Sequence, residues 1–349
     1  MRIGLITKHA RCQSDDILHS IGISWRRFAA LMLLLAMGAP AYGGISGFEI
    51  EEIAPGNYVH YGVHDARSRD NLGDNANIGF IVGEQCVLVF DTGGSRPVGE
   101  ALLEVLRRVT DKPVCYVVIS HVHPDHIFGA AAFMRDHPVV IGHENLPHQL
   151  AARGRFYHEA LERDLGDLAD GSEIVMPTQT VATGDTITVD LGGRKVDIHA
   201  WTPAHTDHDV TVFDRATSTL WLADLLFVEH TPVLDSNITG FLTVMQTLRT
   251  STDVRHYVPG HGRSNEPWPA VLDPQQRYFE VILKETRRAI RDNVPLMDAV
   301  NQIGLSEAQN WVNFETYHRR AVVDRDAAAL GVLQRGAGED DVFDPHKVT

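Results

Sequence analysis

The chain has few cysteines and no long run of basic residues, and each shortage excludes a class of protein. Only three cysteines occur among 349 residues, so a framework of disulfide bonds does not hold the fold together. Acidic residues outnumber basic ones, 46 against 31, and the formal net charge is -15. Because such a surface repels a phosphate backbone, we expect no nucleic-acid partner. The apolar fraction of 44% is that of an ordinary globular protein.

The N-terminal residues have the pattern of an export signal. Two arginines precede the apolar run Phe28 to Met37, and small residues follow it. This run is too short to cross a bilayer as a mature helix, and Ala41 to Gly43 offers cleavage positions. We therefore predict a signal peptide and N-terminal extension over residues 1–43, and a periplasmic or secreted chain without a stable membrane span. An uncleaved anchor and an ordinary core helix are the alternatives.

Two cysteines remain once this segment is set aside. Cys86 and Cys115 both lie in apolar runs rich in β-branched residues. A buried, inert thiol is the usual outcome in such a run, so we expect two free buried cysteines. A single bridge between them is left open.

Short β-branched runs alternate with turn residues and a few amphipathic helices from Phe48 to about Gly262, which predicts a layered α/β domain. The predicted strands are Asn77 to Val82, Cys86 to Phe90, Val114 to Ser120, Val139 to Gly142, Val196 to Trp201, Val210 to Phe213, Leu220 to Ala223 and Arg255 to Val258. Helices are predicted over Pro97 to Val109 and Asn145 to Gly154.

The character of the sequence changes after this domain. Asp273 and Pro274 resemble a helix N-cap and first helical residue, and apolar residues follow at helical spacing. Further helices are predicted over Leu296 to Ile303 and Ser306 to Leu333. The expected organisation is an α/β domain over 44–265, a helical segment over 266–335 and a flexible, polar tail over 336–349.

Histidine is abundant, with 19 residues, and many of them lie in short clusters that indicate metal binding. The densest cluster follows the predicted strand that begins at Val114. It places four candidate ligands within six positions: His121, His123, Asp125 and His126. A strand that opens into a loop can direct such side chains into one cleft. Imidazole and carboxylate together suit zinc, with iron and manganese as alternatives.

Three later segments add further candidate ligands. His205 follows the predicted strand that ends at Trp201, Asp224 follows the strand that ends at Ala223, and His261 follows another strand. Each candidate ligand therefore falls at a strand terminus. A shared cleft along one edge of a sheet sandwich requires this placement.

With these residues, the sequence resembles the metallo-β-lactamase superfamily, whose HxHxDH motif and later His, Asp and His occur here in order between Phe48 and Gly262. The resemblance implies a four-layer αββα sandwich and an enzyme with two metal ions, expected to be zinc. It assigns one metal to His121, His123 and His205, a second to Asp125, His126 and His261, and makes Asp224 the bridge between them.

Asp91 resembles the carboxylate that orients a ligand histidine in this superfamily, although an ordinary turn aspartate fits its sequence context nearly as well. The resemblance implies that two bound metals would lower the pKa of a shared water, so that hydroxide would attack the carbonyl of a small ester, thioester or amide. In that mechanism Asp125 orients the water or carries its proton, so we treat Asp125 and Asp224 as catalytic.

Position 224 separates subfamilies. Typical β-lactamases of the superfamily carry cysteine there, whereas this chain has Asp224, as thioester hydrolases of the glyoxalase II type do. Persulfide dioxygenases with a single iron keep a similar motif and remain an alternative, as does a class B-like β-lactamase. The signal sequence, the segment His205 to Asp209 and the run Asn313 to His318 resemble exported quinoprotein relay system metallohydrolases associated with sulfur oxidation. That resemblance implies association with an exported quinoprotein dehydrogenase system.

Two other histidines are candidates for the substrate pocket. His208 is close to His205 in the sequence, and His230 follows Asp224 in a predicted loop. The remaining histidines that we considered are interpreted as structural or surface residues: His143, His148, His158, His199, His256, His318 and His346.

Overall fold

The computed structural model describes residues 47–323. The predicted signal peptide, the flexible tail and the end of the last predicted helix lie outside these residues. Within them, no helix is both long enough and apolar enough to cross a membrane.

A seven-stranded sheet forms the first half of the domain. Its strands, which lie side by side in chain order, are β1 (Glu51–Ala54), β2 (Asn57–His60), β3 (Ile78–Val82), β4 (Val87–Phe90), β5 (Val114–Val118), β6 (Val139–His143) and β7 (Gln179–Val181). The pairs from β1 to β4 are antiparallel, and those from β4 to β7 are parallel. Strand β4 is buried on both faces, as expected in a covered sheet.

A five-stranded sheet forms the second half. Its order is β12-β11-β10-β9-β8, with β8 (Thr186–Asp190), β9 (Lys195–Ala200), β10 (Val210–Asp214), β11 (Thr219–Phe227) and β12 (His256–His261). Only the pair of β11 and β12 is parallel. The link between these two strands contains helix α5 (Ile238–Arg249), which meets the need of a parallel pair for a long crossover.

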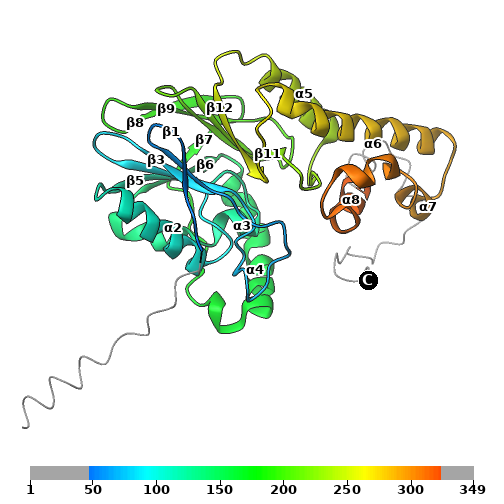
Figure 1. Cartoon of the computed structure of the whole chain (residues 1–349). Coiled ribbons are helices and arrows are strands. Elements are labelled where there is room, and N and C mark those ends of the chain that lie inside the picture. The colour runs from blue at the N-terminus through cyan, green and yellow to red at the C-terminus, as the bar shows by residue number, and fades with distance from the viewer. Residues whose placement is uncertain (1–46, 324–349) are drawn as a thin grey trace, which may run out of the picture. The chain divides into compact units, whose positions relative to one another are not determined.

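Helices cover the outer faces of the two sheets (Figure 1). Helices α2 (Arg96–Val109) and α4 (Leu146–Leu165) pack through Leu102, Leu106 and Leu161 onto the seven-stranded sheet. Helices α5 and α6 (Asp273–Arg291) pack onto the other sheet. A third apolar cluster, which includes Phe90 and Trp221, fills the space between the sheets. The expected αββα sandwich is therefore confirmed.

The predicted strand positions are close to the observed ones, but four strands were missed: β1, β2, β7 and β8. All four strands lie at or near the sheet edges and are only three to five residues long, and β1, β7 and β8 carry exposed polar residues, so their sequences lack a strong apolar signal. Helix α4 continues to Leu165, well beyond its predicted end.

The last predicted helix is not continuous. A 3-10 helix covers Leu305–Asn310, and α8 begins only at Phe314 and is described to Val323. Between them the chain forms a bridge from Val312 to His230, which a continuous helix would not allow. Helix α7 spans Leu296–Val300, inside its predicted range.

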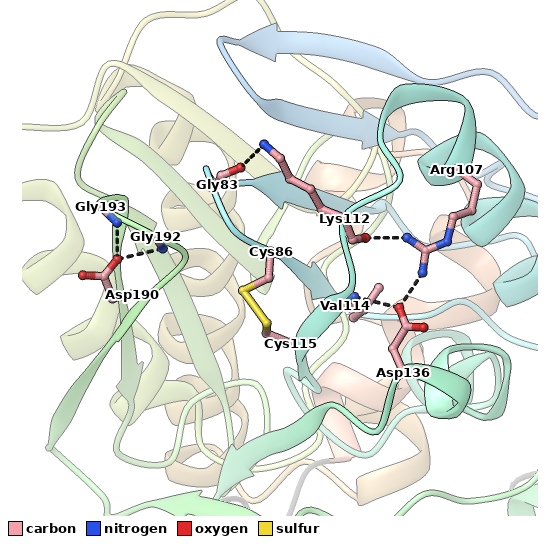
Figure 2. The surroundings of a disulfide bond; sticks show 10 residues. All are labelled: Gly83, Cys86, Arg107, Lys112, Val114, Cys115, Asp136, Asp190, Gly192 and Gly193. Carbon is pink, nitrogen blue, oxygen red and sulfur yellow. Dashed lines mark hydrogen bonds and ion pairs between the residues drawn. A yellow bond between two sulfur atoms is a disulfide. The ribbon is translucent and has the colours of Figure 1, made fainter.

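The expectation of two free cysteines is wrong. Cys86, immediately before β4, and Cys115 in β5 form a disulfide with a Cα–Cα distance of 5.8 Å (Figure 2). The two strands are neighbours in the sheet, so residues that are 29 positions apart in the chain lie side by side. Lys112 donates to the carbonyl of Gly83 at 2.6 Å beside this bridge.

Candidate metal centre

The seven predicted ligands come together where the two sheets meet. His121 lies just beyond β5, and His123 precedes the single helical turn α3 (Pro124–Ile127), which carries Asp125 and His126. The backbone of His123 is extended, with φ -65° and ψ 146°, so the chain leaves the strand direction there before it turns. This turn lets four close neighbours in the sequence face one site.

The other three ligands come from the five-stranded sheet. His205 lies in the loop between β9 and β10, and His261 is the last residue of β12. Asp224 corrects a prediction, because it lies inside β11 and not after a strand end. Ala223 has a left-handed φ of 45°, and the pairing of β11 with β12 is irregular on both sides of it. An irregularity of this kind redirects the next side chain, and here the carboxylate of Asp224 lies at the site.

A glycine on each side of His261 permits the close packing of the site. A Cβ atom at Gly260 would clash with Oδ1 of Asp224, and one at Gly262 would clash with the carbonyl of Val228. Gly262 also has a left-handed φ of 71°. The sequence Gly-His-Gly is therefore required by the geometry around His261.

Donor atoms of these side chains form two groups, each with its atoms within 4.8 Å of one another. The first group contains His121, His123, His205 and Asp224, and the second contains Asp125, His126 and His261. Most of these residues are buried, but the side chains of His123 and Asp125 remain 16% and 25% exposed. The site therefore opens to solvent at these two residues.

The two carboxylate oxygens of Asp224 face different groups. Its Oδ2 lies 3.2 Å from Nε2 of His205 and 3.6 Å from Nε2 of His121. Its Oδ1 lies 3.3 Å from Nε2 of both His126 and His261. One carboxylate oxygen thus faces each group, as a bridging ligand requires.

Hydrogen bonds assign the ring protons to the outer nitrogens of the histidines. Nδ1 of His205 donates to the carbonyl of Val233 at 2.8 Å, and Nδ1 of His261 donates to that of Asn75 at 2.9 Å. The carboxylate of Asp235 lies 3.4 Å from Nε2 of His123. Outer partners of this kind fix the tautomer and the orientation of metal-ligating histidines.

The inner nitrogens then face one another as lone pairs. Nδ1 of His123 lies 3.0 Å from Nε2 of His121 and 2.9 Å from Nε2 of His205. Among the described residues, Nε2 of His126 and Oδ1 of Asp224 are buried and make no hydrogen bond. Buried polar atoms without partners are costly, and one cation in each group would satisfy them. The residues therefore fit divalent metal ions, and their nitrogen and carboxylate donors suit zinc.

Asp91 occupies the orienting position expected from the resemblance. It is fully buried, and its Oδ2 accepts from Nδ1 of His126 at 2.8 Å and from the hydroxyl of Ser120 at 2.7 Å. Because the Ser120 hydroxyl donates to Asp91, it accepts from Nδ1 of His121, which lies 2.9 Å away. One carboxylate therefore orients a histidine in each group.

Electrostatics in the site reflect burial and the close charges. Burial lowers the pKa of His205 to about 4 and holds that of His121 well below its usual value. Burial also opposes the charged form of His126, but the carboxylates of Asp224 and Asp91 raise its pKa well above the usual value. Burial disfavours ionised Asp224, yet the surrounding imidazoles hold its pKa well below the usual value. Asp224 is therefore an anion among imidazoles.

The two candidate pocket histidines lie in different surroundings. His208 is buried, its Nδ1 lies 2.6 Å from Asp207, and its Nε2 accepts from the backbone N–H of Val122 at 3.1 Å. Both ring nitrogens are thus engaged, so we interpret His208 as a support for the loop that carries His123. His230 is also buried, but its ring stacks on His261 with centroids 5.1 Å apart.

Several residues around the ligands were missed by the sequence reasoning. They are Ser120, Asn75, Asp235 and the pair of rings near His230, which come from His64 and Tyr317. Ser120 directly precedes the ligand motif, so its position was an available signal. Asp235 and Asn75 lie far from their partners in the sequence, and no local pattern identifies them.

The model of the metallo-beta-lactamase superfamily matches residues 72–297, about two thirds of the chain. The chain belongs to the metallo-β-lactamase superfamily. This membership supports a metal-dependent hydrolase. A solved structure with the same fold is the DIM-1 metallo-beta-lactamase, which is 17% identical and has a TM-score of 0.51. That similarity covers 66% of this chain and 96% of the DIM-1 chain.

Alkylsulfatases are also similar to this chain. A linear primary-alkylsulfatase of Pseudomonas sp. (strain ATCC 19151) is 38% identical over 56 residues, which are 16% of this chain and 11% of that protein. The solved structure of the sec-alkylsulfatase Pisa1 from Pseudomonas sp. is 14% identical, with a TM-score of 0.63. It covers 85% of this chain, and this chain spans about half of it, 52%.

Proposed function

We propose that the chain is a zinc-dependent hydrolase with two metal ions that cleaves a small ester, thioester or amide. The observation that carries the proposal is the divided carboxylate of Asp224, with Oδ1 3.3 Å from His261 and Oδ2 3.2 Å from His205. A carboxylate in this position suits two cations better than one. The superfamily membership supports the same reaction class.

The chain's own residues have separate tasks in this proposal. When bound, divalent cations supply a Lewis acid for the substrate carbonyl and lower the pKa of water toward neutrality. Asp125 is the partly exposed carboxylate, and its Oδ2 lies 3.5 Å from Nε2 of His261. It is therefore placed to orient a water molecule or to accept its proton at the open side of the site. Asp91 keeps His126 and His121 in the tautomers that present Nε2.

The first experiment measures metal content and turnover together. The mature protein is purified without added metal, analysed for elements, and assayed with a thioester, a carboxylic ester and a β-lactam. About two zinc ions per chain and turnover of one of these substrates is the expected result. One iron per chain with oxygen consumption on a persulfide would replace the proposal with a dioxygenase. Turnover of the β-lactam alone would assign a β-lactamase.

Sulfate ester hydrolysis is a second candidate. The 38% identity with a linear primary-alkylsulfatase favours it, although the similarity covers only 56 residues. An alkyl sulfate in the same assay separates the two functions, because sulfate and alcohol release without ester or thioester turnover would favour the second candidate.

We also propose export to the periplasm or the exterior. The N-terminal pattern supports this location, and so does the disulfide between Cys86 and Cys115, because disulfides persist in oxidising compartments. Cell fractionation with an antibody against the chain tests the location. Co-purification from the same fractions tests the proposed association with a quinoprotein dehydrogenase system.

A further inference from the structure

The C-terminal helical segment reaches the second ligand group through a series of aromatic contacts. The ring of Tyr317, in α8, lies 4.6 Å from the ring of His230 between centroids. The ring of His230 in turn stacks on that of His261, 5.1 Å away with an interplanar angle of 29°. His230 is only 4% exposed, so its neighbours enclose it.

Backbone hydrogen bonds fix this segment to the loop that carries His230. Val312 donates to the carbonyl of Glu229 at 2.7 Å, and Thr231 donates to the carbonyl of Val312 at 3.0 Å. Asn313, next to α8, also donates its side-chain N–H to the carbonyl of His64. The start of α8 is thus attached both to the loop that carries His230 and to the loop that carries His64.

One hydrogen bond to a backbone carbonyl holds the outer nitrogen of His261, as one holds that of His205. The hydrogen bond from Nδ1 of His261 to Asn75 fixes one point of the ring, but the ring can still tilt about that bond. Phe227, at 5.3 Å and nearly parallel, contacts one part of the ring, and His230 contacts another. Because metal affinity depends on the direction of the donor nitrogen, stacking that limits the tilt strengthens binding.

We propose that Tyr317 is a positioning residue for the second metal: through His230, it holds His261 in the orientation that binds this ion. The C-terminal segment thereby acts more strongly on the affinity of the second group than on that of the first, which it reaches less directly, through the contact of Phe227 with both His230 and His205. Within the first group, His121 and His205 are oriented by Ser120 and Val233 instead. This inference rests on the proposed binding of two metals and is independent of the substrate.

Calorimetric titration of Zn²⁺ into the chelator-stripped full chain tests the inference, because it measures the two equivalents separately. For Tyr317→Ala, we expect the affinity of one equivalent to fall by about tenfold, the lower end of the range for an outer-shell partner, because Tyr317 acts through His230. The other equivalent should stay within about twofold of wild type, which also shows that the variant is folded. Tyr317→Phe keeps the ring contact with His230, so a loss in Tyr317→Ala that exceeds the loss in Tyr317→Phe belongs to the ring.

Two further variants complete the experiment. Glu315→Ala changes an exposed residue of the same helix and should leave both equivalents unchanged. Tyr317→Ala should add little when His230 is already alanine, because the two residues act in series. Equal weakening of both equivalents by Tyr317→Ala, or no weakening of either, overturns the inference. Wild-type protein that binds only one Zn²⁺ overturns it together with the proposed two-metal function, whereas two equivalents unaffected by Tyr317→Ala overturn the inference alone.

Discussion

The two ligand groups rest on different supports. In the first group, the outer nitrogens are bound by Ser120, Val233 and Asp235, all of which lie in loops of the sandwich. In the second, only His126 is held from within the sandwich core, by Asp91. His261 depends on the loop that contains Asn75 and on rings that lead to the C-terminal helix. Loops of the sandwich therefore orient the first group, whereas the second group also depends on the C-terminal helix.

Removal of the ligand that the two groups share should have the largest effect on metal binding and turnover. In Asp224→Ala, both groups lose a carboxylate oxygen, so kcat/KM should fall by more than the about 10- to 100-fold typical of an outer-shell partner. Metal content measured by elemental analysis should fall below that of wild type, toward the single ion that the three histidines of the first group can hold. Asp253→Ala, at an exposed aspartate, is the matched control. Full metal content and full turnover in Asp224→Ala would contradict the bridging role.

Loss of the shared outer carboxylate should weaken both groups together. Asp91→Ala removes the acceptor for His126 and, through Ser120, the support of His121. We expect the affinities of both Zn²⁺ equivalents to fall by about 10- to 100-fold. The exposed residue Asp111 supplies the control Asp111→Ala. If the affinity of only one Zn²⁺ equivalent falls, the hydrogen bond from Ser120 to Asp91 does not contribute to metal binding by His121.

A change at Asp235 should affect only the first group. Asp235 contacts His123 from the side opposite the ligand nitrogen, and it also pairs with Arg153. Because the contact with His123 is long, at 3.4 Å, we expect a loss of about tenfold, the lower end of the usual range, for one Zn²⁺ equivalent in Asp235→Ala. Asp235→Asn keeps an oxygen and serves as the control. Weakening of the same equivalent that Tyr317→Ala weakens would refute the division into two supports.

Removal of the disulfide should have the smallest effect on metal binding. Cys86 and Cys115 join β4 and β5 near the ends opposite to Asp91 and Ser120. The double variant Cys86→Ser with Cys115→Ser should lose about 2–4 kcal/mol of unfolding free energy, because the open chain gains conformational freedom. Chemical denaturation of the metal-free chains measures this loss. Weakened Zn²⁺ binding in the folded variant would show that the bridge also positions the ligands.

The sequence identified the side chains that the structure brings together into the two groups, because their signal is chemical and local. His121, His123, Asp125 and His126 lie within six positions after a strongly apolar strand, and the other donors lie at the ends of further predicted strands. The prediction placed Asp224 beyond a strand end, since no local pattern shows the left-handed turn at Ala223 that interrupts β11 without ending it.

Contacts between segments that are distant in the chain could not be predicted from the sequence. Nothing near Cys86 or Cys115 indicates that β4 and β5 are neighbours, so a free thiol was the natural expectation for each cysteine. Asp235 lies 112 positions from His123, and Tyr317 belongs to a helix whose predicted start was displaced by the break at Val312. The edge strands β1 and β8 were missed for a related reason, because pairing with a neighbour stabilises them more than their own apolar content does.

The sequence by itself determined which donor atoms the site contains, the order in which they occur and the family that this order indicates. Donor chemistry belongs to each side chain, and the spacing within one motif is a property of a short piece of chain. Only the tertiary structure decided how Asp224 is divided between the groups, which partner orients each histidine, and that α8 supports His261. Those arrangements depend on contacts between segments that the folding of two sheets and the C-terminal helices brings together.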